Sequence, residues 1–219
     1  MRQYHKIQTV YKRDPETKMK HLLEGQFSLP EFEYLQDNKW VGTEKIDGTN
    51  IRVMWDGERS TIGGKTDNAQ IPMDLVNHLE GSALGDRLGK LFPPQEDEEL
   101  FPEVCLYGEG YGRKIQKGGR DYIPDGVGFI LFDVYVNGWW LKRSDVEDIA
   151  SKLEIPIAPI IVISNLLDAV EFVKRGFSSE VAEGERLAEG LVLRPEVELK
   201  DRAGRRIITK IKYKDFPHA

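Results

Sequence analysis

A lysine followed by an acid and a glycine is the first feature of this sequence that could do chemistry. The string runs from Glu44 to Asn50 and contains Lys45, Asp47 and Gly48. A lysine amine is a nucleophile only without its proton, and removing that proton at pH 7 costs about 4 to 5 kcal/mol for an ordinary lysine. Neighbouring cations lower this cost. Alone, the string is also typical of a simple turn between two strands.

Two lysines near the C-terminus could supply such cations. Lys210 and Lys212 alternate along an expected strand, Arg206–Tyr213, so their side chains share one face. Two ammonium groups there could lower the pKa of Lys45 and balance the charge that develops on a phosphate during attack. An exposed strand face that happens to be basic is the plainer alternative.

Acids and an aromatic residue lie between these two segments. Glu109 stands between two glycines, and Phe132 and Asp133 end an apolar run. Glu189 precedes Gly190 and a second apolar run. Because an uncompensated charge among apolar residues is costly, we expect Asp133 and Glu189 to contact a metal ion, a lysine or a ligand. A structural salt bridge is the alternative for both.

Taken together and in this order, these strings resemble the covalent nucleotidyltransferase superfamily of ATP-dependent DNA and RNA ligases and mRNA capping enzymes. The resemblance implies that Lys45 carries AMP, that Glu109 binds the ribose and that Phe132 stacks on the base. It also implies that Glu189 serves the metal and the phosphate. The matching strings span most of the chain and are Lys45–Gly48, Tyr107–Gly110, Phe129–Asp133, Glu189–Val192 and Lys210–Lys212.

Two of the sequence strings resemble those of the RNA ligase branch, which includes phage RNA ligase 2 and the RNA-editing ligases. These strings are Gly48-Thr49-Asn50 and the run from Gly108 to Gly119. Some members of that branch carry His where this chain has Asp47, the usual residue of DNA ligases. The branch also has a basic residue after the nucleophile, for which Lys65 is the candidate. The full set of expected nucleotide ligands is Glu44, Lys45, Asp47, Gly48, Asn50, Lys65, Glu109, Phe132, Glu189, Lys210 and Lys212.

The resemblance implies an ATP-dependent RNA ligase with a lysyl-AMP intermediate at Lys45. ATP would donate AMP, Mg²⁺ or Mn²⁺ would assist, and Glu189 and Asp133 are the candidate metal ligands. The catalytic residues would be Lys45, Lys210, Lys212 and Glu189. The substrate would be RNA, or a nicked DNA/RNA duplex, with 5′-phosphate and 3′-hydroxyl ends. The alternatives are a minimal ATP-dependent DNA ligase acting on nicks, a capping guanylyltransferase and a non-catalytic RNA- or nucleotide-binding module.

Charge is distributed unevenly along the chain, whose net charge is −6. The segment Lys200–Lys214 holds seven cations against one acid, and an acidic run, Glu96–Glu99, supplies part of the opposite charge. A second basic segment follows Glu109, and we expect it to contact the nucleic-acid backbone. Its cations are Arg113, Lys114, Lys117 and Arg120.

The elements that must position these residues indicate an α+β fold, with mainly antiparallel sheets and flanking helices. Expected helices begin after Ser28, span Pro72–Leu91 with breaks at Gly81 and Gly85, and cover Ser144–Leu153 and Leu166–Arg175. Ser28 and Ser144 have the spacing of helix caps. The expected strands are His5–Arg13, Met19–Leu23, Val41–Ile46, Asn50–Trp55, Arg59–Ile62, Val104–Tyr107, Phe129–Val136, Trp139–Leu141, Gly190–Arg194 and Arg206–Tyr213.

The length of 219 residues suits one nucleotidyltransferase domain, 1–219. Only seven residues follow Lys212, so we expect no C-terminal OB-fold or helical domain here, and a partner protein could replace it. One cysteine and the lack of a long apolar stretch favour the cytoplasm, or the host cytoplasm for a viral protein. We expect a monomer that does not bind membranes.

Overall fold

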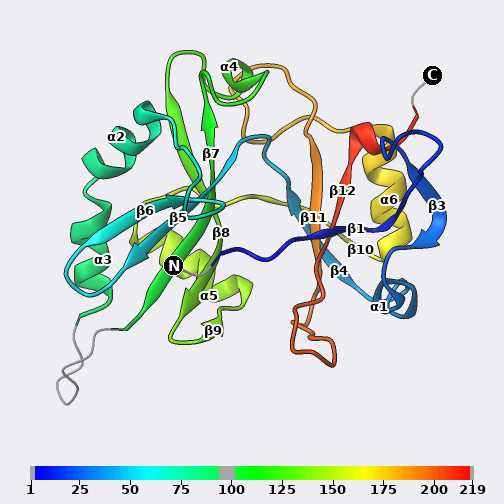
Figure 1. Ribbon diagram of the computed structural model, residues 1–219, viewed down its shortest axis with the longest axis horizontal. Helices are drawn as coiled ribbons and strands as arrows, with labels where there is room; N and C mark the ends of the chain where they lie inside the picture. The colour runs from blue at the N-terminus through cyan, green and yellow to red at the C-terminus, as the bar shows by residue number, and fades with distance from the viewer. Residues whose placement is uncertain (1–2, 94–101, 218–219) are drawn as a thin grey trace. The chain divides into compact units, whose positions relative to one another are not determined.

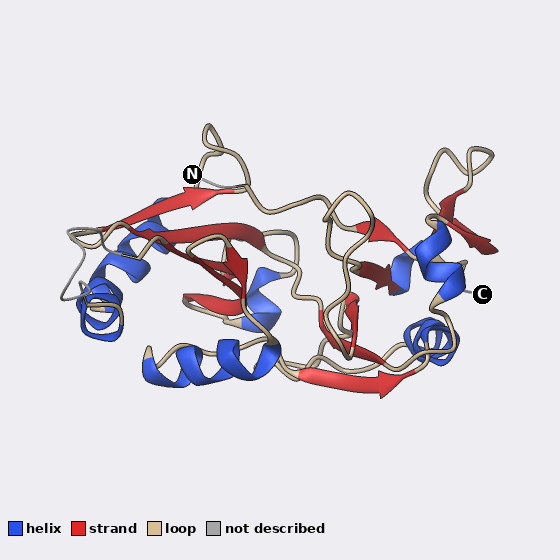
Figure 2. Ribbon diagram, turned by 90° about the horizontal axis from the view of Figure 1, so that it is seen from below, coloured by secondary structure: helices blue, strands red, loops and turns tan. Residues whose placement is uncertain are grey.

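The computed structural model describes residues 3–93 and 102–217, so the acidic run at 96–99 lies outside the described residues. The chain forms two compact units. One comprises residues 1–4, 47–158 and 182–184 and is called the Glu109 unit. The other comprises residues 5–46, 159–181 and 185–219 and is called the Lys45 unit. Strands make up the centre of each unit, and short helices lie beside them (Figure 2).

An antiparallel sheet in the order β6-β5-β7-β8-β9 forms the centre of the Glu109 unit (Figure 1). Asn137 and Gly138 both have positive φ, at 44° and 92°, and make the tight turn between β8 and β9 that their types favour. The strands are β5 (Thr49–Trp55), β6 (Ser60–Gly64), β7 (Val104–Gly112), β8 (Val127–Val136) and β9 (Trp139–Trp140).

Helices cover the apolar face of this sheet because that face carries aliphatic residues at alternate positions. Ile51, Val53, Leu106, Leu131 and Val134 are buried there. The helices supply Leu75, Leu79, Leu84, Leu88, Val146 and Ile149 to the same core. Their bounds are α2 (Met73–Gly81), α3 (Leu84–Leu91), α4 (Gly119–Tyr122) and α5 (Arg143–Lys152).

The Lys45 unit is built on a second sheet, in the order β1-β12-β11-β4-β10. Its pairs are antiparallel except for β1 with β12, which is parallel. The strands are β1 (Gln8–Thr9), β4 (Trp40–Glu44), β10 (Ile160–Ser164), β11 (Gly190–Pro195) and β12 (Thr209–Lys212). A separate hairpin pairs β2 (Tyr11–Arg13) with β3 (Leu22–Phe27).

Helix α6 (Leu166–Arg175) supplies most of the helical surface of this unit's core. Its first turn is capped by Asn165, whose side chain accepts a bond of 2.8 Å from the amide of Asp168. The fully buried Trp40 of β4 donates its indole N–H to the Leu35 carbonyl at 2.8 Å. The remaining helices are α1 (Pro30–Tyr34) and the 3₁₀ turn η1 (Tyr213–Asp215).

The predicted α+β class with antiparallel sheets is confirmed, but several local predictions were wrong. Ser28 donates to the Thr9 carbonyl instead of capping α1, and α5 begins one residue before Ser144. Helix α2 ends at Gly81 as expected and Ala83, whose φ is 53°, precedes α3, but the second expected break is wrong because Gly85 lies inside α3. Strand β7 continues to Gly112, so Glu109 lies in a strand and not in a turn.

Two further expectations concern the whole chain. That residues 1–219 make up a single nucleotidyltransferase domain stays a prediction. Over the part of the chain that the structure describes, no helix combines the length and the apolarity that crossing a membrane requires.

Replacement of Gly108 by Ala should destabilise the Glu109 unit. A Cβ there would lie 2.3 Å from the Phe129 ring and 2.5 Å from the Ile130 carbonyl oxygen, which belongs to the backbone and has little room to move. We expect the free energy of unfolding to fall by about 1–3 kcal/mol, measured by urea denaturation. Gly81→Ala is the matched control, because its Cβ would meet nothing within 4 Å. Equal losses in the two variants would contradict this account.

Candidate active site

Three charged side chains lie at one end of three neighbouring strands in the Lys45 unit. Lys45 follows the last residue of β4, Glu189 precedes the first residue of β11, and Lys212 ends β12. Because β11 is antiparallel to both β4 and β12, these three positions fall at the same end of the sheet. The strand order therefore brings together residues that are far apart in the sequence.

The carboxylate of Glu189 is shared between the two lysines. Its Oε2 accepts from the Lys45 ammonium, and its Oε1 lies 2.5 Å from Nζ of Lys212. The side chain of Glu189 is 7% exposed, against 20% for Lys45 and 19% for Lys212. Burial acts to raise the pKa of Glu189, but the two ammonium groups outweigh it and hold this pKa below its usual value.

Backbone contacts fix the spacing of this charged cluster. The amide of Lys45 donates to the Gly190 carbonyl, and the amide of Tyr213 donates to the Glu189 carbonyl, each at 2.9 Å. Gly190 has a φ of +149°, and a Cβ there would lie 2.0 Å from the Ile211 carbonyl oxygen. Only glycine therefore lets β11 begin so close to β12 with Glu189 beside Lys212.

This arrangement differs in one respect from the sequence-based expectation for Lys45. We expected Lys210 and Lys212 to act on Lys45 as neighbouring cations. Instead, the contacts around Lys45 include the carboxylate of Glu189, which favours the charged form of a lysine. Lys210 and Lys212 are half-buried and alternate with the buried Thr209 and Ile211, as the sequence pattern predicted. A lysine contact was among the expectations for Glu189, but its position between two lysines was not predicted.

Glu44 has a separate role in the same sheet. Its buried carboxylate accepts from the Ser179 hydroxyl and from the amide of Glu180, the latter at 2.8 Å. Burial raises the pKa of Glu44, and these hydrogen bonds oppose that effect only in part. Both carboxylate oxygens of Glu44 thus hold the segment 179–180 to β4, next to Lys45. From the sequence we expected Glu44 to be a nucleotide ligand and did not predict this contact.

In the Glu109 unit, one face of the sheet carries polar residues in rows across the strands. Asn50 on β5 pairs with Glu109 on β7, so their side chains stand side by side on this face. The side-chain oxygen of Asn50 is buried and has no hydrogen-bond partner among the described residues. Gly48 lies close to β7, since a Cβ there would be 2.2 Å from the Gly110 carbonyl oxygen. A buried acceptor without a donor suits a site that a ligand completes.

Phe132 lies at an irregularity of β8. Tyr107 pairs with Asp133 while the adjacent Gly108 pairs with Leu131, so Phe132 is an extra residue in β8 at this shift of register. Phe132 is only half-buried, whereas the neighbouring Leu131 is fully buried. The bulge therefore places an aromatic ring where it is accessible from solvent, as stacking on a base would require.

Tyr4 contacts this bulge and was not predicted as a site residue. Its hydroxyl donates to Oδ2 of Asp133 at 2.7 Å, and its ring lies 5.1 Å from the Phe132 ring in an edge-on arrangement. Asp133 is fully buried. One carboxylate oxygen of this candidate metal ligand is thus occupied by a tyrosine.

Lys65, the candidate basic residue after the nucleophile, is exposed and follows β6. The neighbouring segment is held by Arg52 of β5, whose side chain is fully buried. Its guanidinium donates to the Gly64 carbonyl at 2.7 Å and to Asp67 at 2.9 Å. Arg52 therefore anchors both sides of Lys65.

The basic segment after Glu109 forms a loop that leads into α4. Ile115 is buried, and two of the four cations face acids: Arg113 lies 3.3 Å from Asp125 and Lys114 lies 3.9 Å from Asp74. The other two, Lys117 and Arg120, are exposed. The segment is thus fixed at its apolar residue while its cations face solvent.

The described residues contain no group of three or more His, Cys, Asp or Glu side chains that could hold a metal ion by themselves. Mg²⁺ is commonly held by one or two carboxylates together with phosphate oxygens and water. Glu189 beside two lysines has the donor chemistry for that arrangement, although both of its oxygens contact lysines here.

Comparisons with known proteins agree with this description. The model of the RNA ligase family matches residues 38–213. The RNA ligase of Naegleria gruberi solved with PPi has a TM-score of 0.62 at 20% identity, over 84% of this chain and 52% of that chain. A mutant of the same enzyme with ATP and Mn has 18% identity, the same TM-score and the same coverage. This chain therefore spans about half the length of these relatives, and no curated protein sequence matches it. The predicted nucleotidyltransferase fold is confirmed.

Replacement of Glu189 by Gln should destabilise the protein in a pH-dependent way. At neutral pH it would leave two partly buried ammonium groups without their counter-charge, at a cost of about 1–3 kcal/mol. The lowered pKa of Glu189 means that its stabilisation is present above the usual carboxyl range and is lost as pH falls through the lowered pKa. The gap in unfolding free energy between wild type and variant should therefore narrow in acid. Glu196→Gln, at a half-exposed pair with Lys39, should show no such gap.

Proposed function

The chain belongs to the RNA ligase family, and we propose that it is an ATP-dependent RNA ligase that carries AMP on Lys45. The observation that carries this proposal is the placement of Lys45, Glu189 and Lys212 at the same end of β4, β11 and β12. One cation and one acid next to a candidate nucleophile match what phosphoryl transfer needs. That reaction depends on positioning and on charge balance more than on covalent help from the protein.

In the first step, the uncharged Nζ of Lys45 attacks the α-phosphorus of ATP. The nitrogen–phosphorus bond forms, the bond to the β-phosphate oxygen breaks, and pyrophosphate leaves while Nζ loses a proton. Lys212 and Lys210 donate to the α-phosphate oxygens and stabilise the charge that develops there. Glu189 orients both Lys45 and Lys212. A bound Mg²⁺ or Mn²⁺ would be held at Glu189, with Asp133 as the second candidate, and would supply charge stabilisation at the phosphates.

The next two steps pass AMP to the polynucleotide and seal it. An oxygen of the 5′-phosphate attacks the phosphorus of the lysyl-AMP, and Lys45 is released. A 3′-hydroxyl then attacks the activated 5′-phosphorus, so a phosphodiester bond forms and AMP leaves. The expected substrate is RNA, or a nicked DNA/RNA duplex, with these two ends.

The nucleotide ligands of the Glu109 unit form part of the proposal. Glu109 would accept from the ribose hydroxyls, Phe132 would stack on adenine, and Asn50 would contact the α-phosphate or the attacking group. The buried oxygen of Asn50 and the half-buried ring of Phe132 support these roles. Asp47, Gly48 and Lys65 remain candidate ligands on the resemblance alone. Glu44 is better explained by its contacts to Ser179 and Glu180.

The closest alternative is a DNA ligase that acts on nicks, and Asp47 is the residue that favours it. A comparison of sealing on nicked RNA, nicked DNA and single-stranded RNA with a 5′-phosphate separates the two activities. We predict that the protein acts as a monomer in the cytoplasm. We also predict that a partner protein could take the place of a C-terminal domain.

Incubation with α-labelled ATP and Mg²⁺ should attach label to the protein at Lys45. The label should survive denaturation and be released by acid, because it forms a phosphoramidate. Lys45→Ala should take up no label, since the attacking nitrogen is gone. The matched control is Lys214→Ala, an exposed lysine two residues after Lys212, which should label like the wild type. Label that persists in Lys45→Ala would overturn the proposal, and a preference for GTP would indicate a capping enzyme.

Replacement of Arg113, Lys114, Lys117 and Arg120 together by Ala should weaken RNA binding and flatten its dependence on salt. Each lost phosphate contact should reduce the salt slope by about one. Labelling of Lys45 should be unchanged, because none of these cations is a proposed ligand of ATP. Unchanged RNA affinity in a titration over several salt concentrations would rule this loop out.

A further inference from the structure

We propose that Arg52 and Asp67 are positioning residues that hold Lys65 where it binds a phosphate group of ATP. The three residues belong to the Glu109 unit, and Lys65 directly follows β6, the edge strand of its sheet (Figure 1). The inference rests on the proposed function, because it explains how one of the candidate nucleotide ligands is presented. Neither Arg52 nor Asp67 was predicted as a site residue from the sequence.

Arg52 is a cation that is enclosed by protein. Its side chain is fully buried, and a buried charge needs hydrogen bonds and an opposite charge to compensate for the loss of water. Nε of Arg52 donates to the Gly64 carbonyl at 2.7 Å, and Nη2 donates to Oδ1 of Asp67 at 2.9 Å. Because Arg52 is not exposed to solvent, it acts on a ligand only through the residues that it holds.

Both of these contacts fall on the exposed segment that carries Lys65. Gly64 precedes Lys65, and Asp67 follows it by two residues. A guanidinium group has a rigid, planar set of donors, so bonds from one group to two points of a segment restrain that segment strongly. The backbone on each side of Lys65 is therefore fixed to β5, while the residue itself stays exposed.

The strand register places Lys65 level with two other proposed ligands of ATP. Gly64 pairs with Ile51 in the antiparallel pair of β6 and β5, so the position after Gly64 stands beside Asn50. Asn50 pairs in turn with Glu109 on β7. Because neighbouring strands lie about 5 Å apart, a row across three strands spans about 10 Å, which is the scale of a nucleoside triphosphate.

The charge around Lys65 selects a phosphate group as its ligand. Among the residues that the structure describes, Lys65 forms no salt bridge, and the nearby carboxylate of Asp67 is bonded to Arg52. A lysine ammonium is a compact charge with three donors and commonly binds phosphate groups. One ATP molecule would then lie along the row, with its ribose at Glu109 and a phosphate at Lys65.

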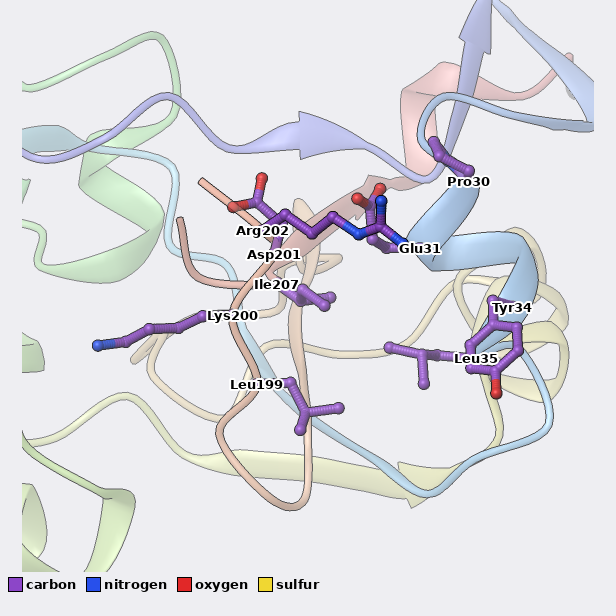
Figure 3. A pocket seen from close by; sticks show the side chains of 9 residues that line it. All are labelled: Pro30, Glu31, Tyr34, Leu35, Leu199, Lys200, Asp201, Arg202 and Ile207. Carbon is purple, nitrogen blue, oxygen red and sulfur yellow. The ribbon is translucent and has the colours of Figure 1, made fainter. Parts of the chain in front are cut away.

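The groove beside α1 in the Lys45 unit has no such selectivity. Two acids, Glu31 and Asp201, and two cations, Lys200 and Arg202, line this groove (Figure 3). Their charges compensate one another, so the groove favours neither an anion nor a cation. The segment at Lys65 differs, because its acid bonds to a cation on the neighbouring strand.

Replacement of Asp67 by Ala tests the positioning role. Asp67 is 61% exposed, so its loss leaves no buried space unfilled. The variant should need about threefold to tenfold more ATP for the half-maximal rate of Lys45 labelling, because the segment loses one of its two bonds to Arg52. Charge alone predicts the opposite result, since removal of an acid beside a phosphate ligand should strengthen the binding of ATP.

Replacement of Lys65 by Ala shows whether Asp67 acts through Lys65. The single variant should need about tenfold more ATP, because one charge-assisted contact to a phosphate is lost. A double variant, Lys65→Ala with Asp67→Ala, should match Lys65→Ala, since the position of the segment matters only while Lys65 is present. The maximal extent of labelling should be the same in all of these variants.

Asp56→Ala is the matched control for Asp67→Ala. Asp56 is a 52% exposed acid in the turn between β5 and β6, and its partner Arg59 is exposed as well. Its removal should leave the ATP dependence of labelling unchanged.

Three results would overturn the positioning role of Arg52 and Asp67. They are an unchanged or lower ATP requirement in Asp67→Ala, effects that multiply in the double variant, and an unchanged ATP requirement in Lys65→Ala. A reduced extent of labelling with a normal ATP requirement would also overturn it, because a purely structural role has that effect. These results all require a wild-type protein that takes up label. A wild-type protein that takes up none would overturn the proposed function, and this inference with it.

Discussion

The shared carboxylate of Glu189 is the interaction on which the candidate site depends. Two ammonium groups at the end of one sheet would repel each other if nothing lay between them. Glu189 removes that repulsion and leaves a cluster of Lys45, Glu189 and Lys212 with one net positive charge. An anionic phosphate is the group that would balance this charge. The cluster is therefore stable without a ligand and still attractive to one.

This cluster also imposes a requirement on any chemistry at Lys45. A carboxylate beside an ammonium group favours the charged form, and the charged form is not a nucleophile. The contact between Lys45 and Glu189 must therefore loosen before Lys45 attacks. The backbone bonds that hold Lys45 to Gly190 and Tyr213 to Glu189 do not involve these side-chain atoms, so the side chains can exchange partners while the strands stay in place.

Much of this could be predicted from the sequence, and the limits have physical causes. The alternation of Lys210 and Lys212 with Thr209 and Ile211 shows the strand and its basic face, because the two faces of a strand differ in burial. The contact between Glu189 and Lys45 could not be deduced in this way. It depends on the order of β4, β11 and β12 in the sheet, and residues far apart in the sequence carry no periodic signal of that order. The roles of Tyr4 and Glu44 were missed for the same reason.

The extra residue in β8 has a consequence for how this strand can vary. The pairing register between β8 and β7 shifts by one residue at the bulge. Deletion of one residue at the bulge would restore regular pairing between β8 and β7. The side chains of the other residues of β8 would stay on the same faces of the sheet. The ladder would gain regularity, and β8 would lose the position that keeps the Phe132 ring half-exposed. On the proposed stacking role of Phe132, the length of β8 at this point would affect nucleotide binding as well as stability.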